Sequence, residues 1–179
     1  SQLTEAKIRL KTALGSFRIK RLPARKSETL QAWDAADELL LDNLATEHAL
    51  VLEEQISNEN RLLIINDQFG ALTTTLNRHA PDSWNDSSIS HLAAQLNHQE
   101  NFKTDSDGDK DKDKDKDKDS DNEASFNAIA STDSLTGSYA IVLIKIPKTL
   151  SLLEQQLSSL SQHINSETII IAAGMTKLI

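Results

Sequence analysis

The chain has 179 residues, 38% of them hydrophobic, no cysteine and a formal net charge of −8, which suits one domain with a hydrophobic core. The lack of cysteine excludes disulfides, thiolate nucleophiles, zinc–thiolate sites and iron–sulfur clusters. No run approaches the roughly 20 apolar residues of a membrane span and no signal peptide is recognisable, so we expect a cytoplasmic protein with no membrane partner.

The first 27 residues are strongly basic, although the chain as a whole is acidic. They hold eight lysines and arginines against Glu5 alone, a local net charge of +7. Within them, residues 15–22 alternate in character, which predicts a strand that ends before Pro23. Clustered cations of this kind bind phosphates. We therefore treat residues 1–26 as a basic arm with one strand, and we expect its phosphate contacts to come from Arg18, Lys20, Arg21, Arg25 and Lys26.

Two helices and a strand are predicted next. Apolar residues recur at helical spacing between Leu30 and Leu44, with Ser27 or Thr29 as the N-cap. The run Arg61–Asn66 is continuously apolar before a polar turn, as in a strand buried on both faces of a parallel sheet. A helix is expected from Phe69 to His79.

Residues 81–86 read as a loop and a weak strand, and residues 88–99 as a helix. We expect that helix to point Ile89, Leu92, Ala93 and Leu96 inward. Residues 104–122 then alternate Asp and Lys with almost nothing apolar, so we expect a disordered, acidic surface insertion. An EF-hand does not fit, because a loop counted from Asp105 would place Lys110 and Lys116 where Gly and Glu are required.

The remaining segment repeats the strand–helix pattern. A buried strand is predicted at 139–146, a helix at 150–164 with Thr149 as its cap, and a strand at 167–173. Strands that alternate with helices favour an α/β fold with a parallel sheet and helices on both faces. We therefore expect residues 27–179 to form one such domain, with any ligand beyond the carboxyl ends of its strands.

The first informative strand end is Asn66–Gly70. Sheets that bind dinucleotides or S-adenosylmethionine place several glycines there, so that the backbone can approach the ligand. Here Gly70 is the single glycine, and Gln68 and Phe69 occupy the turn. We expect no cofactor bound by this chain and interpret Asp67 as a helix N-cap.

The second strand end carries Lys145 and Lys148 on either side of Pro147. Methyltransferases that act on the amines of bases have an Asn/Asp-Pro-Pro-aromatic motif at this position, whose acceptors hold the amine. Ammonium groups cannot accept those hydrogen bonds, but they bind phosphate. We therefore expect both lysines to be exposed phosphate contacts and assign no catalytic residue. No metal site is expected either, since His91 and His98 are seven residues apart and a helical zinc pair needs four.

Three segments carry a family resemblance: residues 30–41, 63–72 and 141–157. They resemble the N-terminal domain of the ribosomal RNA large subunit methyltransferase G family, which is similar to the small-subunit methyltransferase C family. The resemblance implies a Rossmann-like, degenerate methyltransferase domain. It also implies a parent that uses S-adenosylmethionine to methylate a guanine N2 of 23S rRNA, through a catalytic C-terminal domain absent from this chain.

The resemblance leaves the role of this half open. It implies an RNA-recognition and scaffolding domain whose partners are large-subunit rRNA and the catalytic domain. The alternatives are a purely structural module that braces the catalytic domain, or half of a 16S rRNA (guanine-N2)-methyltransferase. The Asp/Lys insertion departs from the family pattern, although a loop of that length adds little closure cost.

Overall fold

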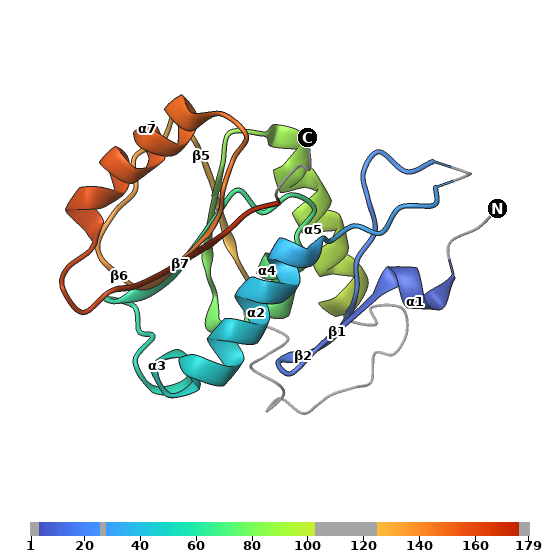
Figure 1. The fold of residues 1–179 in the computed structure, drawn as a ribbon, viewed down its shortest axis with the longest axis horizontal. Helices are drawn as coiled ribbons and strands as arrows, with labels where there is room; N and C mark the ends of the chain where they lie inside the picture. The colour runs from blue at the N-terminus through green and yellow to red at the C-terminus, as the bar shows by residue number, and fades with distance from the viewer. Residues whose placement is uncertain (1–3, 26–27, 103–124, 176–179) are drawn as a thin grey trace, which may run out of the picture.

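The computed structural model describes residues 4–25, 28–102 and 125–175 (Figure 1). The expected insertion at 104–122, as well as Lys26 and Ser27, lies outside these residues. The centre of the molecule is a parallel sheet whose spatial order is β5 (Asn127–Ala130), β4 (Asp82–Asn85), β3 (Arg61–Ile65), β6 (Tyr139–Lys145) and β7 (Ile169–Ala173). The chain passes from β3 to β4 and β5 on one side and then returns to β6 on the other, so the connection order reverses between β3 and β6.

Helices cover both faces of this sheet, as the strand–helix alternation predicts (Figure 1). One face packs against α2 (Ala35–Glu47), α4 (Ala71–Thr75) and α5 (Ser88–Phe102), and the other against α7 (Leu150–Leu160). Shorter helices are α1 (Glu5–Ile8) and α3 (Ala49–Glu54), with 3-10 turns at Asn77–His79 and Ser161–His163. None of the helices in the described ranges is long and apolar enough to cross a bilayer. The α/β, Rossmann-like fold class is confirmed.

Two cores follow from the alternation of side chains along the central strands. Leu62 and Ile64 of β3 face α2 and α4, whereas Leu63 and Ile65 face Leu160 of α7. All four side chains are fully buried. A strand covered on both faces needs a continuous apolar run, which is the pattern that the sequence has at this position.

The N-terminal arm differs from its prediction. The expected strand at 15–22 is a shorter β2 (Gly15–Arg18), paired antiparallel with β1 (Arg9–Thr12) in a hairpin that the sequence did not indicate. The chain beyond β2 is fixed to α5, because the side chains of Asn97 and Asn101 bond the backbone of Lys20 and Arg18 at 2.8–3.0 Å. The described part of the arm is therefore packed against the domain.

Two helices also need correction. The helix expected from Leu30 begins at Ala35, because Asp34 caps it in a reciprocal capping box with Asp37; neither Ser27 nor Thr29 is its cap. In α5 the prediction of the inward face is wrong for Ile89, Leu92 and Leu96, which are exposed. Ala93 is buried as predicted, together with Ala94 and Asn97. Small residues let the helix approach α4 closely, and a Cβ on Gly70 would meet Ala94 Cα at 2.6 Å.

A compact polar cluster lies where three strands begin. Asp82, at the start of β4, accepts hydrogen bonds from Arg61 of β3 and, at 2.6 Å, from the hydroxyl of Tyr139 of β6. The Arg61 guanidinium also lies 4.6 Å from the centre of the Tyr139 ring. Burial and the hydrogen bond to Asp82 raise the pKa of the Tyr139 hydroxyl. We call Arg61, Asp82 and Tyr139 the amino-end cluster.

Candidate functional site

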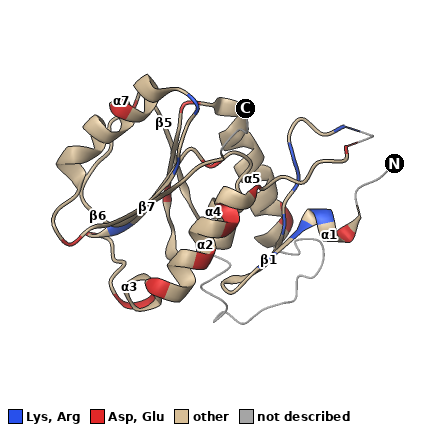
Figure 2. Ribbon diagram, viewed as in Figure 1, with Lys and Arg blue, Asp and Glu red and all other residues tan. Residues whose placement is uncertain are grey.

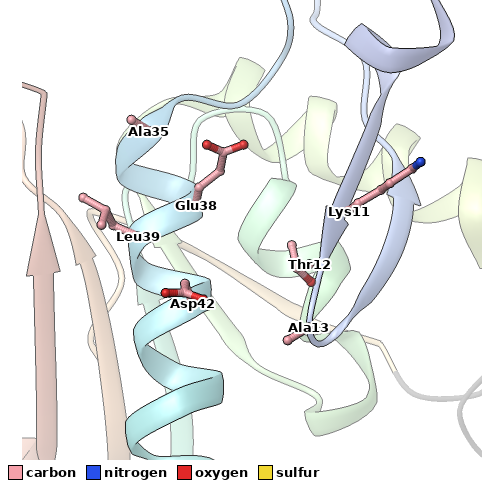
Figure 3. Close-up of a pocket in the computed structure, with 7 residues that line it drawn as sticks. All are labelled: Lys11, Thr12, Ala13, Ala35, Glu38, Leu39 and Asp42. Atoms are coloured by element: carbon pink, nitrogen blue, oxygen red, sulfur yellow. The ribbon is translucent and has the colours of Figure 1, made fainter.

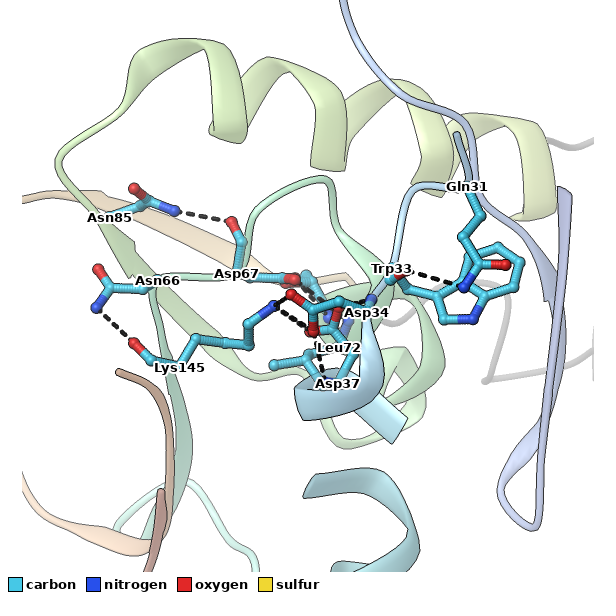
Figure 4. A network of polar contacts seen from close by, with 10 residues as sticks. Gln31, Trp33, Asp34, Asp37, Asn66, Asp67, Leu72, Asn85 and Lys145 are labelled. Atoms are coloured by element: carbon cyan, nitrogen blue, oxygen red, sulfur yellow. Dashed lines mark hydrogen bonds and ion pairs between the residues drawn. The ribbon is translucent and has the colours of Figure 1, made fainter. Parts of the chain in front are cut away.

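A second polar cluster lies at the opposite end of the sheet, around Lys145 (Figure 4). Lys145 ends β6 and reaches across to the start of α2. Its ammonium lies 3.0 and 3.1 Å from the carboxylate oxygens of Asp34 and 3.0 Å from Asp37 Oδ1. The side chain is therefore enclosed, and the residue is only 8% exposed. We call Asp34, Asp37 and Lys145 the carboxyl-end cluster.

The carboxyl-end cluster has more negative than positive groups. Burial raises the pKa of Asp37 to about 7, against the attraction of Lys145 and with added repulsion from Asp67. Burial also disfavours ionised Asp34, but Lys145 outweighs it and the pKa of Asp34 is lowered. The pKa of Lys145 is raised, because its two carboxylates outweigh the cost of its own burial. Asp34 and Lys145 therefore form the firm ion pair, and Asp37 is the group that titrates near neutrality.

The turn after β3 is also filled by side chains of the domain. Asn66, which has a positive φ of 69°, exchanges two amide hydrogen bonds with Gln156 of α7 at 2.8 and 3.0 Å. It also donates to the backbone oxygen of Lys145 at 2.9 Å. Asp67 accepts from the backbone N–H of Leu72 and Thr73, at 3.3 and 2.9 Å, so its carboxylate bonds the first turn of α4. The N-cap residue itself is Gly70 and not Asp67, because the helix begins only at Ala71. Two of the N-terminal amides of α4 are thus bonded within the protein.

A polar hollow of about 680 Å³ remains beside these turns, at the strand-order reversal. Residues from four strand ends line it, among them Asn66, Asn85, Lys145 and Gly174, together with Asp34 at the start of α2. Asn85 donates to the backbone oxygen of Asp67 at 2.8 Å and accepts from Ser87 N–H. Several of the polar groups that line the hollow are therefore already hydrogen-bonded within the protein.

The predicted phosphate contacts that the structure describes fall into three groups. Lys145 was expected to be exposed, and this is wrong, because its ammonium is enclosed by Asp34 and Asp37. Arg18 and Arg21 are partly exposed but engaged: Arg18 pairs with Glu5 at 2.9 Å, and Arg21 lies 4.8 Å above the Phe69 ring. Lys20, Arg25 and Lys148 are exposed, without an ion pair to any described residue, and Lys26 lies outside the described residues.

The exposed cations are distributed over two regions. Figure 2 shows basic positions on the arm and the coil that follows β2, and acidic positions along α2 and α3. Lys20 and Arg25 belong to the arm, whereas Lys148 lies beyond β6 beside the polar hollow. The structure therefore does not bring the predicted phosphate contacts together into one patch.

A further hollow, of about 710 Å³, separates α2 from the tip of the β1–β2 hairpin (Figure 3). Ala35, Glu38, Leu39 and Asp42 of α2 line one side, and residues 11–13 line the other. Leu39 is 61% exposed although it is a large apolar residue. Helix α2 also contacts β7.

The histidines do not form a metal or catalytic site in the part of the chain that is described. No group of three or more potential ligands is found there. Instead, ring nitrogens of His91, His98 and His163 lie 2.7–3.1 Å from oxygens of Ile129, Asn77 and Gly137. These rings hold neighbouring segments together.

Sequence reasoning missed the role of Asp34, Asp37 and Gln156. A signal was present for the first two, because Asp34 and Asp37 are three residues apart immediately before an apolar helical run, the spacing of a capping box. Nothing in the sequence indicated that Lys145, over a hundred residues later, would meet them.

Comparison with known proteins gives a consistent result. Residues 7–179 match the family model described as the RLMG N-terminal domain. The chain is 35% identical over 161 residues to "Ribosomal RNA large subunit methyltransferase G" of Psychromonas ingrahamii, and 36% identical over 163 residues to the protein of that name from Yersinia enterocolitica. Each alignment covers 90% of this chain but 37% and 35% of the relative, so the chain spans about a third of these relatives' length.

Proposed function

The chain belongs to the RLMG N-terminal domain family, and from this premise we propose that it is the RNA-recognising and scaffolding half of a 23S rRNA (guanine-N2)-methyltransferase. In this proposal the parent uses S-adenosylmethionine in a catalytic domain outside these 179 residues, acts in the cytoplasm and has large-subunit rRNA as its substrate. The names of the relatives support rRNA methylation by the parent. The chain alone does not methylate.

The observation that carries the proposal is that the polar groups at both strand ends, beside the polar hollow, are bonded within the domain. At the end of β3, the α4 amides that could bind a ligand are bonded by Asp67, and the close approach allowed by Gly70 is used by Ala94 of α5. At the end of β6, Lys145 is held between carboxylates and offers no acceptor to an amine. These residues do not fit S-adenosylmethionine or a target base.

The arm is the better candidate for RNA contact. Lys20 and Arg25 are exposed and unpaired among the described residues, and Arg18 and Arg21 keep about 30% of their side-chain surface exposed. Glu5, Glu28 and Glu100 lie within 2.9–3.6 Å of these two arginines. RNA phosphates would compete with exposed glutamates for the same guanidinium groups, which weakens the affinity but leaves the binding steeply dependent on salt.

Binding of an rRNA fragment to the chain, titrated at several salt concentrations, tests the RNA role. The variant Lys20→Glu/Arg25→Glu should weaken binding by at least about tenfold at low salt and lower the salt slope by about two. The comparison variant Lys148→Glu reverses the charge of the other exposed lysine predicted to contact phosphate, beside the polar hollow. If the arm is the main contact, this variant should have less than about a threefold effect. Absence of binding at low salt, or equal losses in both variants, would contradict RNA recognition by the arm.

A purely structural role is the second candidate, because α5 exposes an apolar stripe. Ile89, Leu92 and Leu96 are three and four residues apart, on one side of the helix, and all are exposed. A bracing module predicts that Lys20→Glu/Arg25→Glu leaves the parent's methylation unchanged, whereas Leu92→Asp destabilises the parent. RNA recognition predicts instead that Lys20→Glu/Arg25→Glu lowers methylation by the parent at limiting RNA.

A further inference from the structure

We propose that Arg9 and Arg18 form one binding site for a backbone phosphate of RNA, and that the carboxylate of Glu5 occupies this site in the free chain. The inference deepens the proposed function and rests on it, because the ligand is the RNA that the arm is proposed to recognise. It adds Arg9 to the phosphate contacts and makes Glu5 a competitor that RNA displaces. RNA contact through Lys20 and Arg25 does not depend on this site, so the two proposals can fail separately.

The β1–β2 hairpin places the two arginines side by side. Arg9 and Arg18 are direct partners in its antiparallel register, and the side chains of such partners lie on the same face, with Cβ atoms about 5 Å apart. The next pair, Leu10 and Phe17, points the other way and packs against the apolar core. Both arginines therefore lie on the hairpin face that is turned away from the core, with 34% and 31% of their side-chain surface exposed.

Both arginines bond the Glu5 carboxylate at once. Nη1 of Arg18 lies 3.0 and 2.9 Å from its two oxygens, and Nε of Arg9 lies 3.1 Å from Oε2. The pKa of Glu5 is lowered by these hydrogen bonds, first by that from Arg9 and then by those from Arg18. The two guanidinium groups thus converge on one small anion. A phosphodiester is a suitable replacement, because arginine binds carboxylates and phosphates through the same planar set of donors.

Glu5 is weakly held in this site. Its side chain is 60% exposed, and exposed ion pairs contribute little to stability. It also belongs to α1, a helix of four residues with no buried side chain, so little of the fold depends on its position. The other acid near Arg18 is Glu100, which lies farther away at 3.6 Å. An RNA phosphate can therefore displace the Glu5 carboxylate without disturbing the core.

Two lysines extend the site along the same face of the hairpin. Lys11 and Lys20 each follow one of the two arginines by two residues, so the alternation of side chains places them on the outer face. Ile19 N–H donates to Ile8 O at 2.8 Å, which continues the ladder toward Lys20. Both lysines are exposed, and Figure 3 shows Lys11 directed away from α2. A row of cations suits the repeating phosphates of RNA better than a single free anion.

Titration of individual glutamates by NMR tests the displacement. Glu53 of α3 is the matched control, because it too is exposed, lies 2.8 Å from an arginine, Arg78, and has its pKa lowered by that contact. Binding of the rRNA fragment to the 179-residue chain should raise the pKa of Glu5 to its ordinary value or above and leave that of Glu53 unchanged. No rise at Glu5, or an equal rise at both, would overturn the proposal. A rise caused equally by inorganic phosphate alone would also overturn it, in favour of a free anion.

Substitutions at the site provide a second test, read out as affinity for the rRNA fragment. Glu5→Gln removes the competing carboxylate and should raise the affinity at least about threefold at low salt, whereas Glu53→Gln should change it by less than about 1.5-fold. Arg9→Gln should lower the affinity at least about threefold and the salt slope by about one. Equal effects of the two glutamate substitutions, or unchanged binding by Arg9→Gln, would contradict the site.

These outcomes are separable from those that test the proposed function. If the site is wrong but the arm recognises RNA, the wild type still binds the fragment and Lys20→Glu/Arg25→Glu still weakens that binding. If the wild type does not bind the fragment at low salt, RNA recognition by the arm is contradicted, and the phosphate site with it.

Discussion

The two ends of the sheet are both closed by buried ionic groups, but in different ways. At the amino ends of the strands, Asp82 is matched by one guanidinium and one hydroxyl, so its cluster is balanced. At the carboxyl ends, one ammonium faces two carboxylates, and Asp67 is close enough to raise the pKa of Asp37 further. The balanced end has a structural role, since every group in it is satisfied.

The unbalanced end is where α/β sheets normally bind their ligands. An excess of carboxylates repels phosphate, and the single cation in the cluster is already enclosed. The comparison indicates that a strand end can lose its ligand site through side chains that bond one another there, while the sheet beneath remains intact.

The largest effect is expected from Asp82→Ala. It leaves the Arg61 charge and the buried Tyr139 hydroxyl without their shared acceptor, which should reduce the free energy of unfolding by about 3–5 kcal/mol. Urea denaturation monitored by tryptophan fluorescence measures this. A loss below about 1 kcal/mol would mean that the amino-end cluster has no structural role.

Lys145→Met should cost about 3 kcal/mol in the same measurement, because the buried Asp37 and the partly exposed Asp34 lose their cation. Adding Asp37→Asn should recover part of that loss, since it removes one of the unpaired charges. The control Lys148→Met alters an exposed side chain and should stay within about 0.5 kcal/mol. An equal loss of unfolding free energy in Lys145→Met and Lys148→Met would mean that the ion pairs of Lys145 with Asp34 and Asp37 do not stabilise the fold.

Asp37 should make stability depend on pH. Because its pKa in the folded chain is raised to about 7 from the ordinary value of 3.8, its contribution is complete below about pH 3.8 and is lost as the pH rises through about 7. The stability of the wild type relative to Asp37→Asn should therefore be about 2 kcal/mol higher at pH 5 than at pH 8. A difference that is flat across this range would exclude the raised pKa.

Tyr139→Phe should have the smallest effect, about 1 kcal/mol. The substitution removes one hydrogen bond of 2.6 Å, but Asp82 keeps its ion pair with Arg61. Thermal unfolding at neutral pH provides the measurement. A cost equal to that of Asp82→Ala would show that the hydroxyl, rather than the ion pair, holds the amino-end cluster together.

The sequence predicted the main strands because their apolar runs are continuous. β3, β6 and β7 all lie within the predicted segments. Asp67 bonds the first turn of α4 with its side chain, although the N-cap residue is Gly70. The short β5 was not predicted, because Asn127–Ala130 has only one large apolar residue and its pairing with β4 is a long-range contact. The exposed stripe of α5 was missed for a related reason: periodicity identifies an apolar side of a helix, but close packing through Ala93 and Ala94 decided which side is buried.

The candidate site was predictable only in part. The loss of the glycine loop could be seen in Gln68, Phe69 and Gly70, since it depends on residue types within one turn. The enclosure of Lys145 could not, because it depends on two carboxylates contributed by α2 across the fold.

Calorimetric titration of the chain with S-adenosylmethionine tests the central claim most directly. If the polar groups at the strand ends are already used by Asp67, Lys145 and their partners, the titration should give no saturable heat at millimolar ligand. A saturable signal with one site per chain would contradict the account and would assign cofactor binding to this domain.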